Sequence, residues 1–378
     1  AQELFMDLLK ERAETGRIYI MNIDHCNTHS SFKDKVYMSN LCQEITLPTT
    51  PIQHIDDKEG EIALCILSAI NLGLLTDIDE LEELCDLSVR ALDEIIDYQE
   101  YPVEAAKIST LARRSLGIGF IGLAHYLAKN QVNYESKAAA KLVDKVSEAF
   151  QFYLLKASNN LAKEKSKCLW FEKTKYSDGI LPIDTYKKEL DEVVSRKYTY
   201  DWEWLRKEIK EHGLRHSTLS AQMPSESSSV VSNATNGVEP PRDYLSIKKS
   251  KKGPLKQIVP DYNRLKNFYT LLWDMKSNEG YINIISVMQK YFDQAISGNW
   301  SYNPENYKDG EVPLSVMAQD LLNTYKLGWK TAYYQNTYDA KTEIEEPVHP
   351  IGWHDGVEEK EENKEVLNDE ENCEACTI

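Results

Sequence analysis

Apolar residues recur at helical spacing over two long stretches of the chain. The first runs from Thr76 to Leu127 and contains LEELCDLSVRALDEIIDYQE and LAHYLAK, and the second contains KLVDKVSEAFQFYLLKASNNLAKEKSK. Spacings of three and four residues place apolar side chains on one face, so both stretches predict helices. Runs rich in β-forming residues lie around them: RIYIMNID, QEITL, GIGFIG, STLSAQM and AYYQN. Strands that alternate with helices favour an α/β barrel or a layered sheet.

One glycine pattern has the spacing of a dinucleotide-binding loop. Gly117, Gly119 and Gly122 fit G-x-G-x-x-G. That fingerprint requires a preceding hydrophobic strand and an acidic residue about twenty positions further on. The preceding STLARRSL is a poor strand, and glycines also allow a strand and a helix to pack closely. We therefore favour packing over cofactor binding, and we expect His125 on the following helix to be structural.

The segment YMSNLCQEITLPTTP, residues 37–51, combines a thiol with an amide and a carboxylate. In an extended segment alternate side chains point the same way, so Asn40, Cys42 and Glu44 would share one face. Such a group could be catalytic. It could also be the polar face of an edge strand.

The segment LSAQMPSESSSVVSNATNG, residues 219–237, leads through a proline into a cluster of hydroxyls. A helix that starts near Ser225 would present free N–H groups and the positive end of its dipole beside several serines. That composition suits a phosphate site. Capping of the helix by Ser225, with Glu226 favourable in the first turn, explains the pattern equally well.

A tyrosine doublet follows the last predicted helix, in VPLSVMAQDLLNTYKLGWKTAYYQNT. This helix should begin near Pro313, and its apolar stripe comprises Leu314, Met317, Leu321, Leu322, Tyr325 and Trp329. Tyr333 and Tyr334 come just after it. Doublets of tyrosine usually serve packing or interfaces. Because a phenol can lose one electron reversibly, a redox relay is the alternative.

The charge is concentrated at one end of the chain. The 378 residues carry a net charge of −17, and residues 343–372 contain twelve acidic and two basic side chains, which gives −10 there. This segment has two prolines, few apolar residues and no periodicity, so we expect a disordered tail. An acidic body with an acidic tail disfavours nucleic-acid binding, which requires a basic surface.

The longest apolar run, from Ile62 to Leu75, contains Ser68 and Asn71 and is too short to span a bilayer. The opening AQELFMDLLKERAETG is typical of an amphipathic helix rather than a secretory signal. We therefore expect a soluble, cytosolic protein that does not bind membranes.

Each of the seven cysteines has to be judged alone, because an odd number in a large chain disfavours a disulfide scaffold. Cys85 lies on an apolar helical stripe and should be core. Cys373 and Cys376 form a C-x-x-C pair in NCEACTI, which suits thiol exchange or half of a metal site. No second pair lies nearby, so zinc is disfavoured and no metal is expected. A dithiol on a flexible acidic tether could act as a thiol shuttle.

Seven motifs and the final cysteine pair occur in an order that resembles a known family: HCNTHSSF, SNLCQEI, GEIALC, RRSLGIG, GILPIDTYKKEL, MPSESSS and AYYQNT. From about Gly16 to Ile378 the chain resembles the large, catalytic subunit of class I ribonucleotide reductase. The resemblance implies a ten-stranded α/β barrel with a radical cysteine on an internal loop. The implied activity is reduction of ribonucleoside diphosphates to 2′-deoxyribonucleoside diphosphates by thiyl-radical chemistry.

The resemblance assigns roles to the residues of the central motif. Cys42 matches the radical cysteine that removes the 3′ hydrogen of the substrate. Glu44 matches the carboxylate that accepts the 3′-hydroxyl proton, and Asn40 matches the amide that orients the substrate. A base on the 3′-hydroxyl helps to expel the neighbouring 2′-hydroxyl. Cys65 resembles one of two cysteines that supply reducing equivalents and end as a disulfide.

Other motifs match the family outside that centre. Tyr333 and Tyr334 resemble the last relay that passes the radical to Cys42, and adjacent tyrosines on a strand would need a local twist to stack. Cys373 and Cys376 match the tail dithiol, which thioredoxin or glutaredoxin reduces. The segment that holds the substrate diphosphate is matched by Ser225, Glu226, Ser227 and Ser228. The stripe of Leu314, Met317, Leu321 and Tyr325 is expected to form part of a groove for the small subunit.

Several parts of the family pattern have no match here. The second reductive cysteine, the nucleotide-effector loops and an ATP cone belong to the upstream half, and Cys26 is the only spare thiol near Cys42. We therefore expect residues 1–340 to be the C-terminal half of the barrel and residues 341–378 its tail, from a split or truncated large subunit. The chain should bind no cofactor itself. It should need the N-terminal half and a small subunit that supplies the radical, expected to be a di-iron tyrosyl radical.

Two alternatives stay open at this point. An adenosylcobalamin or glycyl-radical reductase shares the barrel, but the tyrosine doublet favours the class with a separate radical-generating subunit. A non-catalytic fragment that binds and regulates the small subunit is the alternative from another class. The presence of Cys42, Glu44, Cys65 and both tail thiols argues against it.

Overall fold

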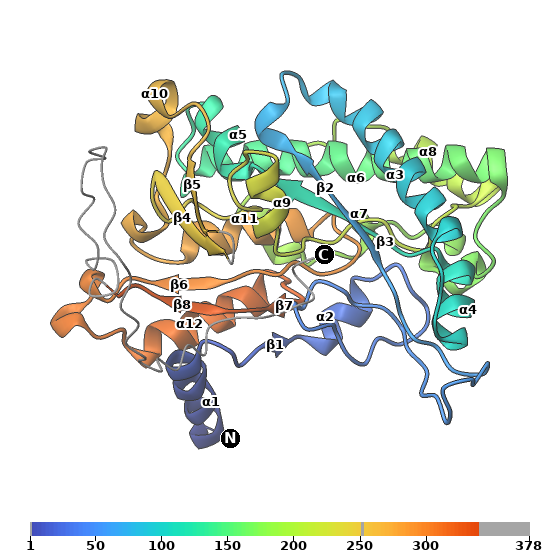
Figure 1. Ribbon diagram of the computed structural model, residues 1–378, viewed down its shortest axis with the longest axis horizontal. Helices are drawn as coiled ribbons and strands as arrows, with labels where there is room; N and C mark the ends of the chain where they lie inside the picture. The colour runs from blue at the N-terminus through green and yellow to red at the C-terminus, as the bar shows by residue number, and fades with distance from the viewer. Residues whose placement is uncertain (1, 251–252, 340–378) are drawn as a thin grey trace, which may run out of the picture.

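The computed structural model describes residues 2–250 and 253–339, and Figure 1 shows helices packed around a set of strands. The predicted tail, with Cys373 and Cys376, lies outside the described residues. No helix in the described part of the chain is both long enough and apolar enough to cross a membrane.

The described residues alternate between helices and short strands. The α-helices are α1 (Gln2–Thr15), α2 (Ile23–Thr28), α3 (Leu81–Tyr98), α4 (Glu104–Arg113), α5 (Leu123–Lys129), α6 (Lys137–Lys165), α7 (Pro182–Thr185), α8 (Trp202–His212), α9 (Glu226–Val231), α10 (Tyr262–Leu265), α11 (Glu279–Gln289) and α12 (Leu314–Lys326). The strands are β1 (Ile20–Met21), β2 (Ile66–Asn71), β3 (Leu116–Ile121), β4 (Leu245–Ser250), β5 (Gly253–Ile258), β6 (Trp300–Tyr302), β7 (Thr331–Ala332) and β8 (Gln335–Thr337).

The helices predicted from apolar spacing are present, and polar side chains set where they start. A capping box of Asp77 and Glu80 precedes α3, and the Ser136 side chain accepts a hydrogen bond from Ala139 N, 3.1 Å away, at the start of α6. These contacts satisfy N–H groups that a helix leaves without partners. The helices α3 and α6 pack together, and Cys85 is fully buried there, which confirms that it is core.

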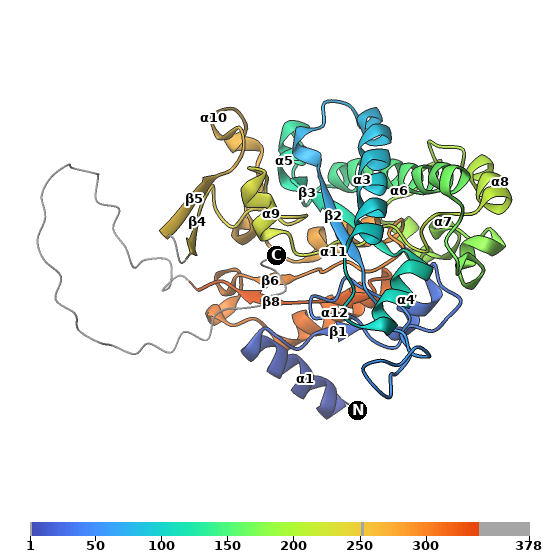
Figure 2. The ribbon, with the colours of Figure 1, turned by 45° about the vertical axis from the view of Figure 1, so that its right-hand side comes forward.

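Two of the four strand pairs in the described residues, β2–β3 and β6–β8, are parallel and joined by helices, whereas β1–β7 and β4–β5 are antiparallel. β2 and β3 pair in parallel with Ile66 opposite Leu116. Parallel bridges continue the sheet from Ile118 to Ser220 and from Gln222 to Ile296. Parallel neighbours with helical crossovers are the βαβ arrangement, so the α/β prediction is confirmed. Figure 1 and Figure 2 show α3 and α6 on one side of these strands, and α1 and α12 beyond β6 and β8.

Two predicted strands are not formed and one strand was missed. QEITL, residues 43–47, forms no strand, and STLSAQM, residues 217–223, forms only isolated bridges at Ser220 and Gln222. β2 lies in the apolar run that was considered only for its length, and it was not predicted. Gly117 and Gly119 lie within β3, and a Cβ on Gly119 would stand 2.6 Å from Ala221 O, so these glycines allow close approach of a neighbouring extended segment rather than of the predicted helix.

A buried carboxylate joins the inner strands. Asp293 is 3% exposed. It accepts hydrogen bonds from Leu219 N at 2.9 Å and Ser220 N at 2.8 Å. Hydroxyls of Thr218 and Tyr176 donate to it from 2.8 and 2.9 Å. A buried charge requires such donors, so Asp293 fixes residues 218–220 against the segment that follows α11.

Candidate active site

The thiol at position 42 lies on a tight turn rather than on a strand. Gln43 N donates to Asn40 O at 3.1 Å, and Ile45 N donates to Asn40 Oδ1 at 3.0 Å. Gln43 adopts a left-handed φ of 70°. The predicted extended conformation was wrong, because the asparagine side chain closes a turn of the kind that it favours elsewhere.

The turn nevertheless buries the residues predicted to act together. Cys42 is 5% exposed and Glu44 is 3% exposed, whereas Leu41 between the amide and the thiol is 55% exposed. Alternation in a strand is therefore not what places the thiol and the carboxylate inside. The turn directs both of them inward.

Residues 295–297 and β7 hold this turn through its backbone. Ala295 N donates to Glu44 O at 3.0 Å, and the Thr331 hydroxyl donates to Gln43 O at 2.9 Å. The Ser297 hydroxyl lies within hydrogen-bonding distance of Cys42 O and is 3.3 Å from Glu44 Oε2. Three consecutive residues of the turn are thus anchored from a strand-like segment and a strand.

The Glu44 carboxyl group is set up to hold a proton. Burial raises its pKa above the ordinary value for glutamate, and hydrogen bonds from Asn40 and Ser297 oppose this effect. A carboxyl group with a raised pKa can accept a proton near neutral pH.

Cys65 lies directly before β2 and is partly exposed. Gln294 Nε2 donates to its Sγ at 3.4 Å, and a Cβ on Gly117 would stand 2.9 Å from that sulfur. Burial is the main cause that raises the pKa of the thiol, and the charges of Glu44 and Asp293 add to it. Cys65 therefore stays protonated at neutral pH and retains its hydrogen atom.

Gln294 connects the two thiol regions and was missed by sequence reasoning. Its side chain is fully buried. Oε1 accepts from Thr46 N at 3.3 Å, while Nε2 donates to Leu116 O at 3.0 Å as well as to Cys65. A lone glutamine follows no recognisable pattern. Its role comes from contacts with residues more than 170 positions away.

The tyrosine doublet lies against the buried thiol. Tyr333 Oη is 3.6 Å from Cys42 Sγ, and the Tyr333 and Tyr334 ring centroids are 3.9 Å apart with the planes tilted by 45°. The two residues lie between β7 and β8 and belong to neither strand. The expected local departure from strand geometry is therefore present. Burial is the main cause that raises the Tyr333 pKa, so this phenol stays protonated.

A third tyrosine, which the sequence analysis did not single out, contacts both rings. The Tyr19 centroid lies 4.7 Å from that of Tyr333 and 5.6 Å from that of Tyr334. Burial raises the pKa of Tyr19 to about 12. The position follows from β1 and β7, which pair antiparallel with Ile20 opposite Ala332.

The predicted phosphate segment forms the start of α9. Ser225 lies at its N-cap, but the side chain makes no capping bond and its Oγ donates to Met223 O at 3.0 Å. The capping explanation is therefore wrong. Glu226, Ser227 and Ser228 are exposed in the first turn. Residues 222 and 295–297 join this segment to the Cys42 turn, because Gln222 N donates to Ala295 O at 3.1 Å.

Two other residues named from the sequence are buried away from the Cys42 turn. Cys26 is fully buried and donates to Lys330 O at 3.6 Å, and burial raises its pKa to about 12. His125 is buried, and its Nε2 lies 3.2 Å from Asp261 Oδ2, a contact compatible with the structural role expected for it.

The apolar stripe on α12 mainly packs on the protein itself. Met317 is 5% exposed, and Leu314 and Leu321 lie partly buried against the core. The Tyr325 hydroxyl donates to Asp24 Oδ2 at 2.6 Å, and its ring stacks on His25. α12 packs against α1 and α11, while Tyr325 stays 43% exposed, so the groove for the small subunit stays a prediction.

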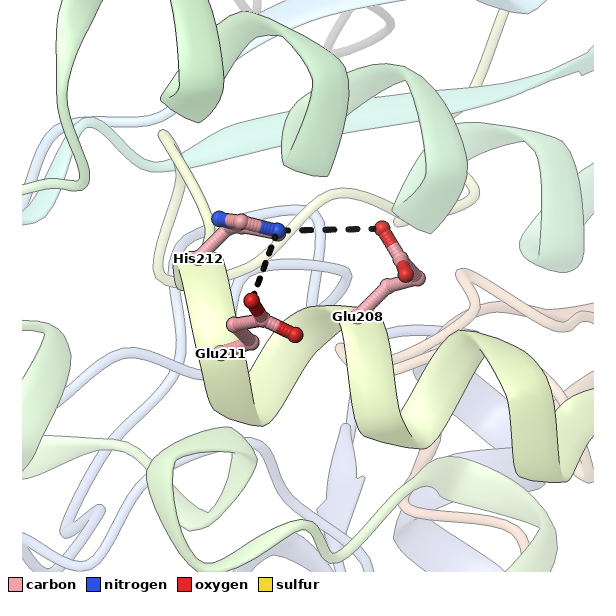
Figure 3. Close-up of side chains that lie close together, drawn as sticks. All are labelled: Glu208, Glu211 and His212. Carbon is pink, nitrogen blue, oxygen red and sulfur yellow. Dashed lines mark ion pairs between the residues drawn. The ribbon is translucent and has the colours of Figure 1, made fainter.

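One group of carboxylates and a histidine lies at the end of α8, shown in Figure 3. His212 Nε2 is 4.0 Å from Glu208 Oε2 and 3.7 Å from Glu211 Oε1. Lys163 Nζ lies 2.5 Å from Glu208 Oε2. The lysine satisfies that carboxylate, so we treat the group as a surface ion-pair network separate from the thiol site.

Fold and site define an α/β domain in which a buried thiol on a turn lies between a carboxyl group and a contacting pair of tyrosines. Comparison with known proteins agrees with this class. Residues 1–335 match the family described as ribonucleotide reductase, barrel domain. The chain belongs to this family.

The chain is also similar to curated relatives of about twice its length. It is 59% identical over 351 residues to the ribonucleoside-diphosphate reductase subunit alpha of Haemophilus influenzae, covering 92% of this chain and 46% of the relative. It is 55% identical over 361 residues to subunit alpha of ribonucleoside-diphosphate reductase 1 of Escherichia coli, covering 95% of this chain and 47% of the relative. For the Enterobacteria phage T4 subunit alpha the identity is 42% over 358 residues, covering 92% and 47%. The chain spans about half the length of these relatives.

Proposed function

We propose that this chain carries the radical chemistry, and part of the reducing chemistry, of a ribonucleoside-diphosphate reductase large subunit. The observation that carries the proposal is the contact of 3.6 Å between Tyr333 Oη and Cys42 Sγ. A phenol in contact with a buried thiol allows an electron and a proton to move together over a short distance. Glu44 lies on the same turn and is buried with the thiol.

The proposed reaction begins outside this chain. A one-electron oxidant in a separate small subunit, proposed to be a di-iron tyrosyl radical, takes an electron and a proton from the tyrosine relay. The Tyr333 radical then takes the hydrogen atom of the Cys42 thiol. The Cys42 thiyl radical removes the 3′ hydrogen of the ribonucleotide.

Loss of the 2′-hydroxyl follows from the 3′ radical. Asn40 holds the substrate, and Glu44 accepts the 3′-hydroxyl proton, so electron density moves toward C2′. One of the two reducing thiols protonates the 2′-hydroxyl, which leaves as water, and Glu44 later returns its proton to the 3′ oxygen. Cys65 and a second thiol outside this chain supply two hydrogen equivalents and become a disulfide. Cys42 returns its hydrogen atom to C3′, which restores the thiyl radical.

The other predicted regions have supporting roles in this proposal. The exposed first turn of α9, with Glu226, Ser227 and Ser228, would hold the substrate diphosphate through backbone N–H groups and hydroxyls, with Ser225 beside it. Residues 341–378 would act as a tether, on which Cys373 and Cys376 re-reduce the disulfide and are themselves reduced by thioredoxin or glutaredoxin. Nucleotide effectors would bind a part of the large subunit outside this chain.

An open strand edge supports the need for a further polypeptide segment. Within the part of the chain that the structure describes, β2 is paired only with β3. Leu67 on β2 is 41% exposed and Leu64 just before it is 36% exposed. An unpaired strand edge with exposed apolar residues is a surface that another strand can cover. We propose that the N-terminal half of the barrel covers it and brings the second reducing thiol to Cys65.

Assembly of the enzyme from its parts tests the proposed function. We expect no turnover of any ribonucleoside diphosphate by this chain with the small subunit alone. Addition of the N-terminal half should restore turnover, because Cys65 then gains its disulfide partner. Turnover without that half would contradict the proposed division of the site. Binding of the small subunit with no turnover in any combination would favour the non-catalytic alternative.

Glu44→Gln should raise the stability of the protein at alkaline pH and lower its turnover. Burial raises the Glu44 pKa, so the folded state binds this proton more tightly than the unfolded state. The contribution to the free energy of unfolding is therefore fully present below the ordinary carboxyl pKa, and it is lost as pH rises through the raised value. Glutamine avoids that loss, so the variant should be the more stable protein at pH 8, with a smaller difference at pH 4.

Turnover should change in the opposite direction. Removal of a general base lowers the rate by about 10²–10⁴-fold. Chemical denaturation at both pH values and turnover of the assembled enzyme measure the two effects. Glu59→Gln, on an exposed loop, is the matched control and should change neither. A variant less stable than the parent at pH 8 would show that Glu44 is held as a structural charge.

A further inference from the structure

Arg12 is a buried cation that contacts the backbone of the tyrosine doublet. It belongs to α1 and is fully buried. Its Nη1 donates to Tyr333 O at 2.8 Å and also to Ile18 O. Its Nη2 donates to Tyr334 O at 3.2 Å. One guanidinium therefore binds the carbonyl groups of two consecutive residues.

This arrangement is incompatible with a regular strand. In a strand, successive carbonyl groups point to opposite sides, and so do successive side chains. Two neighbouring carbonyls that bind the same guanidinium must point toward the same side. The same departure from strand geometry brings the Tyr333 and Tyr334 rings to a centroid distance of 3.9 Å. The cation and the ring contact are thus consequences of one backbone conformation.

The buried charge is stabilised without an ion pair. Among the described residues, no carboxylate forms a salt bridge with Arg12, whose Cζ lies 4.6 Å from the centre of the Trp300 ring. Burial lowers the pKa of Arg12 to about 10. A buried charge is costly unless polar groups compensate it. Here carbonyl groups and an aromatic face provide that compensation. The guanidinium is thereby held beside the carbonyl groups of Tyr333 and Tyr334.

The remaining contacts to the doublet fix its residues one at a time. Tyr333 N donates to Gly298 O at 2.8 Å, and Trp300 N donates to Tyr334 O at 2.9 Å. Tyr334 N donates to Asn299 Oδ1 at 2.9 Å. None of these groups contacts both carbonyls. Arg12 is the side chain that fixes the two residues relative to each other.

We propose that Arg12 is a positioning residue that holds Tyr333 and Tyr334 in ring contact, so that transfer between them depends on it. The proposal rests on the relay described above. In that step a Tyr334 radical, formed by the one-electron oxidant of the small subunit, takes one electron and one proton from Tyr333. Tyr334 becomes a neutral phenol and Tyr333 becomes the radical. Arg12 itself neither gains nor loses a proton or an electron.

Radical trapping at each tyrosine tests this role. In the assembled enzyme, 3-aminotyrosine, which is more easily oxidised than tyrosine, replaces either Tyr333 or Tyr334, and electron paramagnetic resonance measures the radical yield. The parent protein should give a radical at both positions. Arg12→Met, which keeps aliphatic bulk and removes the donors, should keep the radical at 334. The rate of its formation at 333 should fall by about a hundred-fold, the effect of misplacing reacting groups by about 1 Å.

Lys10→Met is the matched control, because Lys10 lies on the same helix with a side chain that is 67% exposed. It should leave both radicals unchanged. If Arg12→Met misfolds and gives no radical at either 333 or 334, Arg12→Lys replaces it as the test variant. Lysine keeps the positive charge but lacks the two donor groups that bind the two carbonyls. Slower radical formation at position 333, with that at 334 unchanged, supports the role of Arg12. Unchanged rates of radical formation at both positions in either variant overturn it. A parent protein without any radical at 334 would instead contradict the relay.

Discussion

Cys42→Ser should abolish nucleotide reduction by the assembled enzyme while the protein stays folded. An O–H bond is much stronger than an S–H bond, so the Tyr333 radical, whose oxygen lies 3.6 Å from Sγ, cannot take a hydrogen atom from serine. The loss should be about 10⁶-fold, which is the scale observed when an essential reacting group is removed. Steady-state formation of deoxyribonucleotide measures it.

Cys26→Ser provides the matched control for that experiment. Cys26 is also a buried thiol, but its contact is with the backbone at Lys330. Turnover should stay within a few-fold of the parent, with some loss of stability because a hydroxyl replaces a buried thiol. Substantial turnover by Cys42→Ser would mean that another group starts the reaction, and the assignment of the radical thiol would fail.

Tyr333→Phe and Tyr334→Phe should each remove turnover and leave binding of the small subunit unchanged. Phenylalanine keeps the ring contact, which has a centroid distance of 3.9 Å, but it has no hydroxyl to give up with an electron. Without an oxidisable side chain at either position, the electron would have to be transferred over a longer distance in one step. Turnover should fall to assay background, on the order of the loss for Cys42→Ser. Turnover and small-subunit affinity are measured on the same preparations.

The control for the ring variants is Tyr325→Phe on α12. This tyrosine is 43% exposed and donates its hydroxyl to Asp24. Removal of that exposed bond should lower the free energy of unfolding only slightly and leave turnover unchanged. If either doublet variant behaves like this control, Tyr333 and Tyr334 serve packing only, and the oxidant reaches Cys42 by a different route.

The sequence predicted elements with strong periodicity and missed those fixed by distant contacts. The helices α3 and α6 follow from apolar spacing, whereas the caps at Asp77 and Ser136 that set their starts were not predicted. β2 was missed because ILSAIN is a short apolar run, whose periodicity does not distinguish a buried strand from a helix. The α12 stripe was correctly identified as apolar, but the pattern does not say whether its partner is this chain or another.

The candidate site was predicted in composition more than in geometry. The residue types at 40, 42 and 44 indicated chemistry, yet the backbone is a turn because Asn40 Oδ1 accepts from Ile45 N. Such local side-chain contacts compete with a strand and leave no periodic signal. Gln294 and Arg12 were missed for another reason. Their partners lie far away along the chain, at Leu116 for one and at the tyrosine doublet for the other.

Residues 294–297 contact both thiol regions of the site. Gln294 supports Cys65, and Ala295 and Ser297 support the Cys42 turn. Since alternate side chains of an extended segment face opposite ways, a slip of one residue would replace every one of these contacts together. If Cys42 carries the radical as proposed, a misfolded chain would lose the oxidising turn and its reducing thiol at once.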